Sequence, residues 1–190
     1  MNHSIKPEEH ELQQARQIVE TAIESSKYTL DKQKPFTLHL GHAERDEVGD
    51  FGVFGKARDS ENGQIFFNTS KDGWKQNLND LTIDIYGQAW FYENKENHEF
   101  VWQQLLANTT GLLLIDKVSD SREPDYNGLK EEWNEKKQDL SDQLSIENQE
   151  NFSWQLKLIL GRKLLDSYEL DDFPDLNRSD VIEAGDNSFL

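Results

Sequence analysis

Two histidines that stand close together are the first residues in this sequence that could do chemistry. His39 and His42 lie at the end of a segment in which apolar and polar residues alternate, and Glu44 and Asp46 follow them. Imidazole and carboxylate groups bind several divalent ions. A metal site at this strand end is therefore one hypothesis. The simpler interpretation, that these are ordinary polar residues of a strand and loop, is the one we favour.

The second candidate is the segment Leu81–Trp90, which contains Asp84, Ile85 and Gln88. A zinc peptidase helix carries the motif His-Glu-x-x-His, in which two histidines one turn apart bind the metal and the glutamate activates water. With His, Glu and His at positions 84, 85 and 88, this segment would read His-Glu-Tyr-Gly-His. Asp can bind zinc, Gln rarely does, and Ile85 cannot act as a base.

The surroundings of this segment resemble a bacterial family of predicted zinc-dependent proteases of the His-Glu-x-x-His type. Ile65–Asn68 resembles the edge strand before the metal helix, and Leu105–Leu112 resembles the following helix, with Asn108 at about the position of the glutamate that is the third ligand. The pieces 154–168, 180–183 and 187–189 resemble the closing helices. The resemblance spans roughly residues 36–190 in short stretches.

This resemblance implies a zincin-like fold and an inactive relative, a pseudopeptidase, that is retained for binding. Asp84, Ile85, Gln88 and Asn108 would then be vestigial metal-site positions, with no catalytic residue and no cofactor. The alternative is that Asp84 and Gln88 are ordinary polar residues on an unrelated element.

Composition excludes several other classes of function. The chain has 190 residues, no cysteine, and 37 acidic against 20 basic residues, for a formal charge of −17. Without cysteine there is no disulfide, thiolate metal site or cysteine nucleophile. So acidic a surface repels phosphate backbones and anionic membranes, so we expect no direct nucleic-acid or membrane binding. The polar segment Met1–Glu11 predicts no signal peptide, and a cytoplasmic location is expected.

The pattern of apolar residues predicts a single α+β domain over residues 1–190, with a small sheet followed by a helical C-terminal half. A helix is predicted at about 7–26, a strand-rich part at about 35–70, and a helical part at about 75–190. The predicted strands are 36–40, 52–57 and 64–68, the last two joined by a turn at 60–63; the predicted helices are 78–92, 100–117, 129–144, 152–170 and one from Ser179 to about Gly185. Residues 78–92 also alternate as a strand would, and we favour the helix because the apolar pattern continues past Gly87.

These observations favour a non-catalytic protein that binds a protein or peptide, with a basic partner as one candidate. Two alternatives stay open. One is an acidic inhibitor or immunity-type protein that mimics a nucleic acid and blocks a basic partner. The other is a metal-dependent hydrolase whose site the sequence does not reveal. The oligomeric state is left open.

Overall fold

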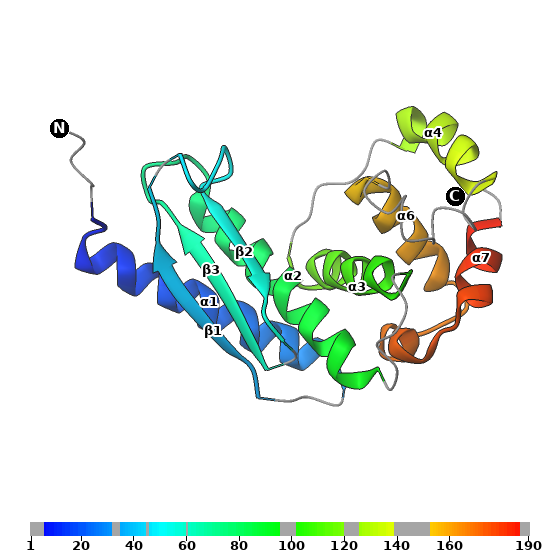
Figure 1. Ribbon diagram of the computed structural model, residues 1–190, viewed down its shortest axis with the longest axis horizontal. Helices are drawn as coiled ribbons and strands as arrows, with labels where there is room; N and C mark the ends of the chain where they lie inside the picture. Colours follow the sequence, from blue (N-terminus) through cyan, green and yellow to red (C-terminus); the bar gives the residue numbers. More distant parts are fainter. Residues whose placement is uncertain are drawn as a thin grey trace.

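The computed structural model describes residues 6–31, 35–44, 46–59, 61–95, 102–119, 126–138 and 153–186. Along the chain it contains α1 (Glu9–Thr29), β1 (Thr37–His42), β2 (Val53–Ala57), β3 (Asn62–Phe67), α2 (Trp74–Asn94), α3 (Trp102–Val118), α4 (Tyr126–Gln138), α6 (Trp154–Leu164), the 3₁₀ helix η2 (Leu170–Asp175) and α7 (Arg178–Asp186) (Figure 1). An N-terminal helix, a small mixed sheet and a mostly helical C-terminal half confirm the predicted α+β class. The predicted helical residues 139–144 and 152, and the similar stretch 187–189, lie outside the described residues.

The sheet has the strand order β1-β3-β2, with β1 parallel and β2 antiparallel to the central strand β3. Its inner face carries Leu38, Ile65, Phe67 and other apolar side chains, which pack against one side of α1 and α2. Because successive side chains of a strand point to opposite faces, this packing fixes the register of all three strands.

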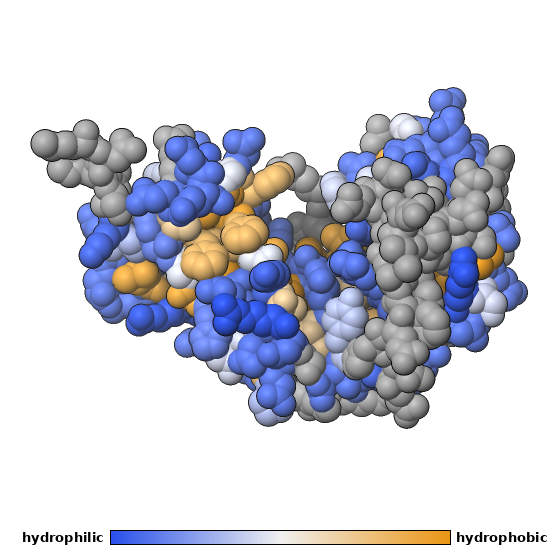
Figure 2. Space-filling model, in the orientation of Figure 1, coloured by the Kyte–Doolittle hydropathy of each residue, from blue (hydrophilic) through white to orange (hydrophobic). Residues whose placement is uncertain are grey.

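No helix covers the outer face of the sheet in Figure 1, and apolar atoms gather there in Figure 2. The register places Gly41, Phe66 and Phe54 side by side across the three strands. The rings of Phe54 and Phe66 stack with centroids 6.2 Å apart, and Phe54 is 54% exposed. The strands contain no aspartate or glutamate, so the acidic residues of this chain lie elsewhere.

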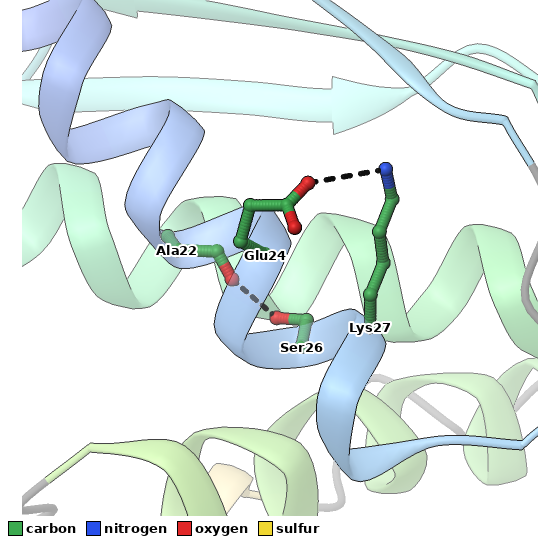
Figure 3. Close-up of polar contacts among 4 residues, drawn as sticks. All are labelled: Ala22, Glu24, Ser26 and Lys27. Atoms are coloured by element: carbon green, nitrogen blue, oxygen red, sulfur yellow. Dashed lines mark hydrogen bonds and ion pairs between the residues drawn. The ribbon is translucent and has the colours of Figure 1, made fainter.

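Helix α1 begins with a capping box in which the side chains of Glu8 and Glu11 each accept a hydrogen bond from the other residue's backbone. It buries a stripe of small residues that includes Ala15 and Ala22. Near its end the buried Ser26 hydroxyl donates a 2.7 Å hydrogen bond to the Ala22 carbonyl, so no polar group is left unsatisfied there (Figure 3).

Helix α2 is buried on two sides, which explains its ambiguous sequence pattern. Leu78 and Ile85 belong to the core beneath the sheet, whereas Ile83 and Trp90 belong to the larger core formed with the C-terminal helices. Two buried faces produce apolar residues at spacings of two as well as three and four. The helix interpretation is therefore confirmed, and the alternation reflects a double interface.

The C-terminal helices pack closely through small residues. A Cβ atom on Gly161 of α6 would lie 2.7 Å from side-chain atoms of Thr109 and Leu113 on α3, so glycine is needed where these helices meet. Close by, Arg162 donates hydrogen bonds of 2.8 and 3.2 Å to the two carboxylate oxygens of Asp116. This bidentate pair fixes the relative rotation of α3 and α6.

Several predicted boundaries differ from the structure, and three of the differences have a clear local cause. The turn predicted at 60–63 is too long, because Asn62 and Gly63 already pair with the neighbouring strands as part of β3. The helix predicted at 152–170 ends at Leu164, and the capping box of Glu169 and Asp172 starts η2. The last helix is capped by Asn177 and not by Ser179, since the Asn177 side chain accepts a hydrogen bond from the Asp180 backbone.

Among the helices of the described residues, none is both long enough and apolar enough to cross a membrane.

Candidate functional site

The structure does not bring His39 and His42 together, because the two residues lie on opposite faces of β1. His39 is exposed on the outer face of the sheet, beside Gln64 in the register. His42 is partly buried on the inner face, where its ring contacts the edge of Phe67 at 6.0 Å between centroids. Across the part of the chain that is described, no group of three or more His, Asp or Glu side chains is arranged to hold a metal ion.

Asp84 and Gln88 do come together, one turn apart on α2. The Gln88 side-chain amide donates a 3.0 Å hydrogen bond to Asp84 Oδ1. The same carboxylate lies against Gly111 of α3, so closely that a Cβ atom on Gly111 would overlap it. Gly87 packs on Gly111 as well, since its own Cβ would be 2.9 Å from the Gly111 Cα. The backbones of α2 and α3 therefore lie in close contact beside Asp84.

Burial raises the pKa of Asp84 to about 6, and the hydrogen bond from Gln88 and the positive charge of Lys157 on α6 oppose that rise. Burial in turn lowers the pKa of Lys157, while Asp84 raises it. Asp84 on α2 and Lys157 on α6 thus influence each other's charge, and both are partly removed from water.

The other two vestigial positions lie in different surroundings. Ile85 is 1% exposed and belongs to the core beneath the sheet, with its side chain against Gly63 of β3. It therefore faces the sheet and not the meeting point of α2 and α3. Asn108 is partly buried on α3, one helical turn before Gly111.

These donors do not fit a catalytic zinc ion. Zinc in proteins is bound by thiolates, imidazoles and carboxylates, and a catalytic site needs three such ligands and a base. Asp84, Gln88 and Asn108 provide one carboxylate and two amides, and Asp84 Oδ1 already accepts the Gln88 amide. The arrangement is a satisfied polar contact within a helix interface.

A groove of about 530 Å³ opens on the N-terminal side of Asp84, and we call it the apolar groove. Its apolar lining comes from the loop before β2, from α3 and from α6: Phe51, Leu112, Ile115, Trp154 and Leu158. Figure 2 shows the molecule hollowed between its sheet-bearing and helical parts. Phe51 is 70% and Trp154 48% exposed, which is unusual for such large side chains.

The polar lining of the apolar groove is acidic. Asp50, Asp72 and Asp80 line it together with the amides of Gln76 and Asn77. Asp80 lies one turn before Asp84, and its Oδ1 atom accepts hydrogen bonds from Gln76 at 2.8 Å and from the Ser119 hydroxyl at 3.1 Å. Asn77 donates a 2.8 Å hydrogen bond to the Phe51 carbonyl, which fixes the loop that carries Phe51.

A second hollow, of about 710 Å³, lies at the other end of the vestigial positions. Gln88 and Tyr92 of α2 line it together with Lys56 and Arg58 at the end of β2. It contains both basic and acidic side chains, and less apolar surface than the apolar groove. Asp84 and Gln88 thus lie on α2 between two hollows. The apolar groove is acidic, and the second hollow contains both basic and acidic side chains.

Sequence reasoning found Asp84, Gln88 and Asn108 but missed the apolar groove. Its residues come from four separate segments, and singly they look like ordinary loop or helix residues. One signal was available: Trp154 stands in the first turn of α6, just after the cap Ser153, where a large aromatic residue has few neighbours of its own helix to cover it.

Comparison with known proteins identifies no relative of this chain. No family model, curated protein or solved structure matches the chain.

Proposed function

We propose that this chain is a non-catalytic binding protein, a degenerate relative of the zinc peptidases, that holds a segment of a protein or peptide in the apolar groove. The observation that carries the proposal is the position of that groove. It runs along the same helix as Asp84 and Gln88 and is lined by exposed aromatic and apolar side chains.

The order and packing of the elements support kinship with zincins. Helix α2 directly follows a small sheet. The segment 65–68, which the resemblance matches to an edge strand, belongs instead to the central strand β3, and the edge strand that packs beside α2 is β2. Helix α3 then crosses α2 so that Gly111 lies on Asp84 and Asn108 lies one turn away. This is the arrangement that the His-Glu-x-x-His resemblance implies for a metal helix and a following helix with the third ligand.

The chemistry of the same residues supports a non-catalytic role. Ile85, at the position of the catalytic glutamate, is part of the core. The carboxylate of Asp84 is satisfied by Gln88 and packed against a backbone. Ile85 and Asp84 provide neither a catalytic base nor a set of metal ligands. The feature of this region that supports a binding function is the apolar groove.

Selection from a library of displayed random peptides tests the proposal. We expect wild-type protein to enrich a family of related peptides that bind with micromolar affinity. Ile115→Glu, which places a charge in the apolar lining of the groove, should abolish that binding. Phe54→Ser, which removes an exposed aromatic ring from the outer face of the sheet, is the matched control and should bind normally. If no peptide family is enriched, or if both variants bind alike, the proposal is wrong.

Metal analysis gives an independent prediction. After dialysis against buffer with zinc, elemental mass spectrometry should find far less than one zinc per chain, because one carboxylate and two amides are a poor zinc site. The thermal midpoint should be the same with and without EDTA. One tightly bound zinc per chain would contradict the non-catalytic proposal and would favour a metal-dependent hydrolase.

A further inference from the structure

We infer that the occupant of the apolar groove is a basic segment, in which a lysine or arginine side chain lies next to an apolar residue. The inference rests on the proposed function and narrows it to one class of partner. It depends on two properties of the same groove, its charge and the exposure of its aromatic side chains.

Charge is the first property. The described residues that line the groove include three aspartates and no lysine, arginine or histidine. Two lysines near the groove interact with carboxylates: Lys71 Nζ lies 4.0 Å from Asp50 Oδ1, and the charge of Lys157 acts on Asp84. Because the whole chain carries a formal charge of −17, its long-range field also attracts a cationic partner and repels an acidic one.

Asp80 is the best-placed carboxylate to receive a cation. Gln76, Asn79 and Ser119 all donate to its Oδ1 atom, at 2.8, 3.0 and 3.1 Å. These bonds hold the carboxylate in one orientation on the wall of the groove. No described side chain donates to Oδ2, so that oxygen is oriented in advance for an ammonium or guanidinium group.

Aromatic exposure is the second property. Phe51 lies in the loop before β2 and Trp154 lies on α6, and Leu112 and Ile115 of α3 line the same groove. A purely polar ligand would leave these side chains in water, whereas an apolar residue beside the basic one would cover them. Trp and Tyr side chains in such places are frequent centres of binding energy at interfaces. The flexible apolar stem of lysine or arginine can lie along the same surface.

Fluorescence anisotropy with synthetic peptides tests the inference. The probe is a short fluorescein-labelled peptide in which lysines alternate with leucines. Two matched peptides replace every lysine by glutamate, or every leucine by serine. We expect only the lysine–leucine peptide to bind well, and its affinity to fall steeply as NaCl rises from about 0.05 M to about 0.5 M, because salt screens exposed charges.

Two triple variants separate the groove from the overall charge. Asp50→Asn, Asp72→Asn and Asp80→Asn together should weaken binding by about 10-fold to 100-fold, as expected for the loss of three carboxylates that attract the lysines of the peptide. Glu20→Gln, Asp166→Asn and Glu183→Gln change the net charge equally at exposed positions that do not line the groove, and should weaken binding less than about 3-fold. Trp154→Ala should weaken it about 10-fold. Circular dichroism establishes that each variant is folded.

The outcomes distinguish the inference from the function on which it rests. Equal losses in the two triple variants would show general attraction to an acidic surface and would overturn the inference. Equal binding of the lysine and glutamate peptides, with loss in Trp154→Ala, would leave the groove as a binding site but overturn its preference for basic segments. Failure of all three peptides, together with an empty peptide selection, would overturn the proposed function itself.

Discussion

Gly111→Ala should lower the free energy of unfolding by about 3 kcal/mol, the largest loss we expect from adding one methyl group to this protein. The new Cβ would overlap the Asp84 carboxylate and would lie 2.8 Å from the Asp84 carbonyl oxygen. The carboxylate could rotate away only by leaving Gln88, and the carbonyl belongs to the backbone of α2. The two helices would therefore have to separate. The better helix propensity of alanine would offset only about 1 kcal/mol of that cost.

Thermal or urea unfolding measures this effect. For a protein of this size a loss of about 3 kcal/mol lowers the midpoint by about 6 to 12 °C. Gln104→Ala, on an exposed position of the same helix, is the control and should change stability by less than about 0.5 kcal/mol. A Gly111→Ala protein as stable as wild type would mean that α2 and α3 do not approach each other as described, and the assignment of Asp84 and Asn108 to one region would fail with it.

The tight contact of α2 with α3 also shows what could be predicted from sequence. Periodicity identified both helices and the three strands, because each buries an apolar face of regular spacing. It could not show that Gly87 and Gly111 pack on each other, since a glycine inside a helix looks the same whether it meets another backbone or water. Contacts between distant segments depend on the crossing of helices, and no local pattern records that crossing.

Sequence reasoning about the candidate site succeeded where one helix determines the geometry. Asp84 and Gln88 are four residues apart, so their proximity follows from helical spacing alone. His39 and His42 are three apart on a strand, and alternation sends them to opposite faces. The apolar groove could not be predicted from the sequence, because Phe51, Leu112 and Trp154 come together only when the sheet, α3 and α6 are packed.

Asp84→Asn should stabilise the protein above pH 6 and leave its stability unchanged near pH 3.5. The pKa of Asp84 in the folded protein is about 6, compared with an ordinary value of 3.8. Between these two pH values the folded chain holds a proton that the unfolded chain has lost. The contribution of Asp84 to wild-type stability therefore falls as pH rises from about 4 to about 6, and above pH 6 its charge costs at most about 3 kcal/mol.

The asparagine has nearly the same shape, remains neutral at every pH, and can still accept the hydrogen bond from Gln88. The difference in unfolding free energy between Asp84→Asn and wild type, measured in urea from pH 3.5 to pH 8, should thus rise from near zero to a plateau of about 1 to 3 kcal/mol. All other titrations are common to both proteins and cancel in this difference. Asp166→Asn, at an exposed position, is the control for the loss of one carboxylate.

Lys157→Met provides a second test of the pKa of the same carboxylate. Lys157 lowers the pKa of Asp84, so its removal should raise that pKa further, extend the rise in the difference curve to higher pH and increase its plateau. A flat curve for Asp84→Asn would show that Asp84 is well solvated in the folded protein, and the description of its carboxylate as packed between α2 and α3 would be wrong. An unchanged curve in the Lys157→Met background would show that Lys157 does not act on this carboxylate.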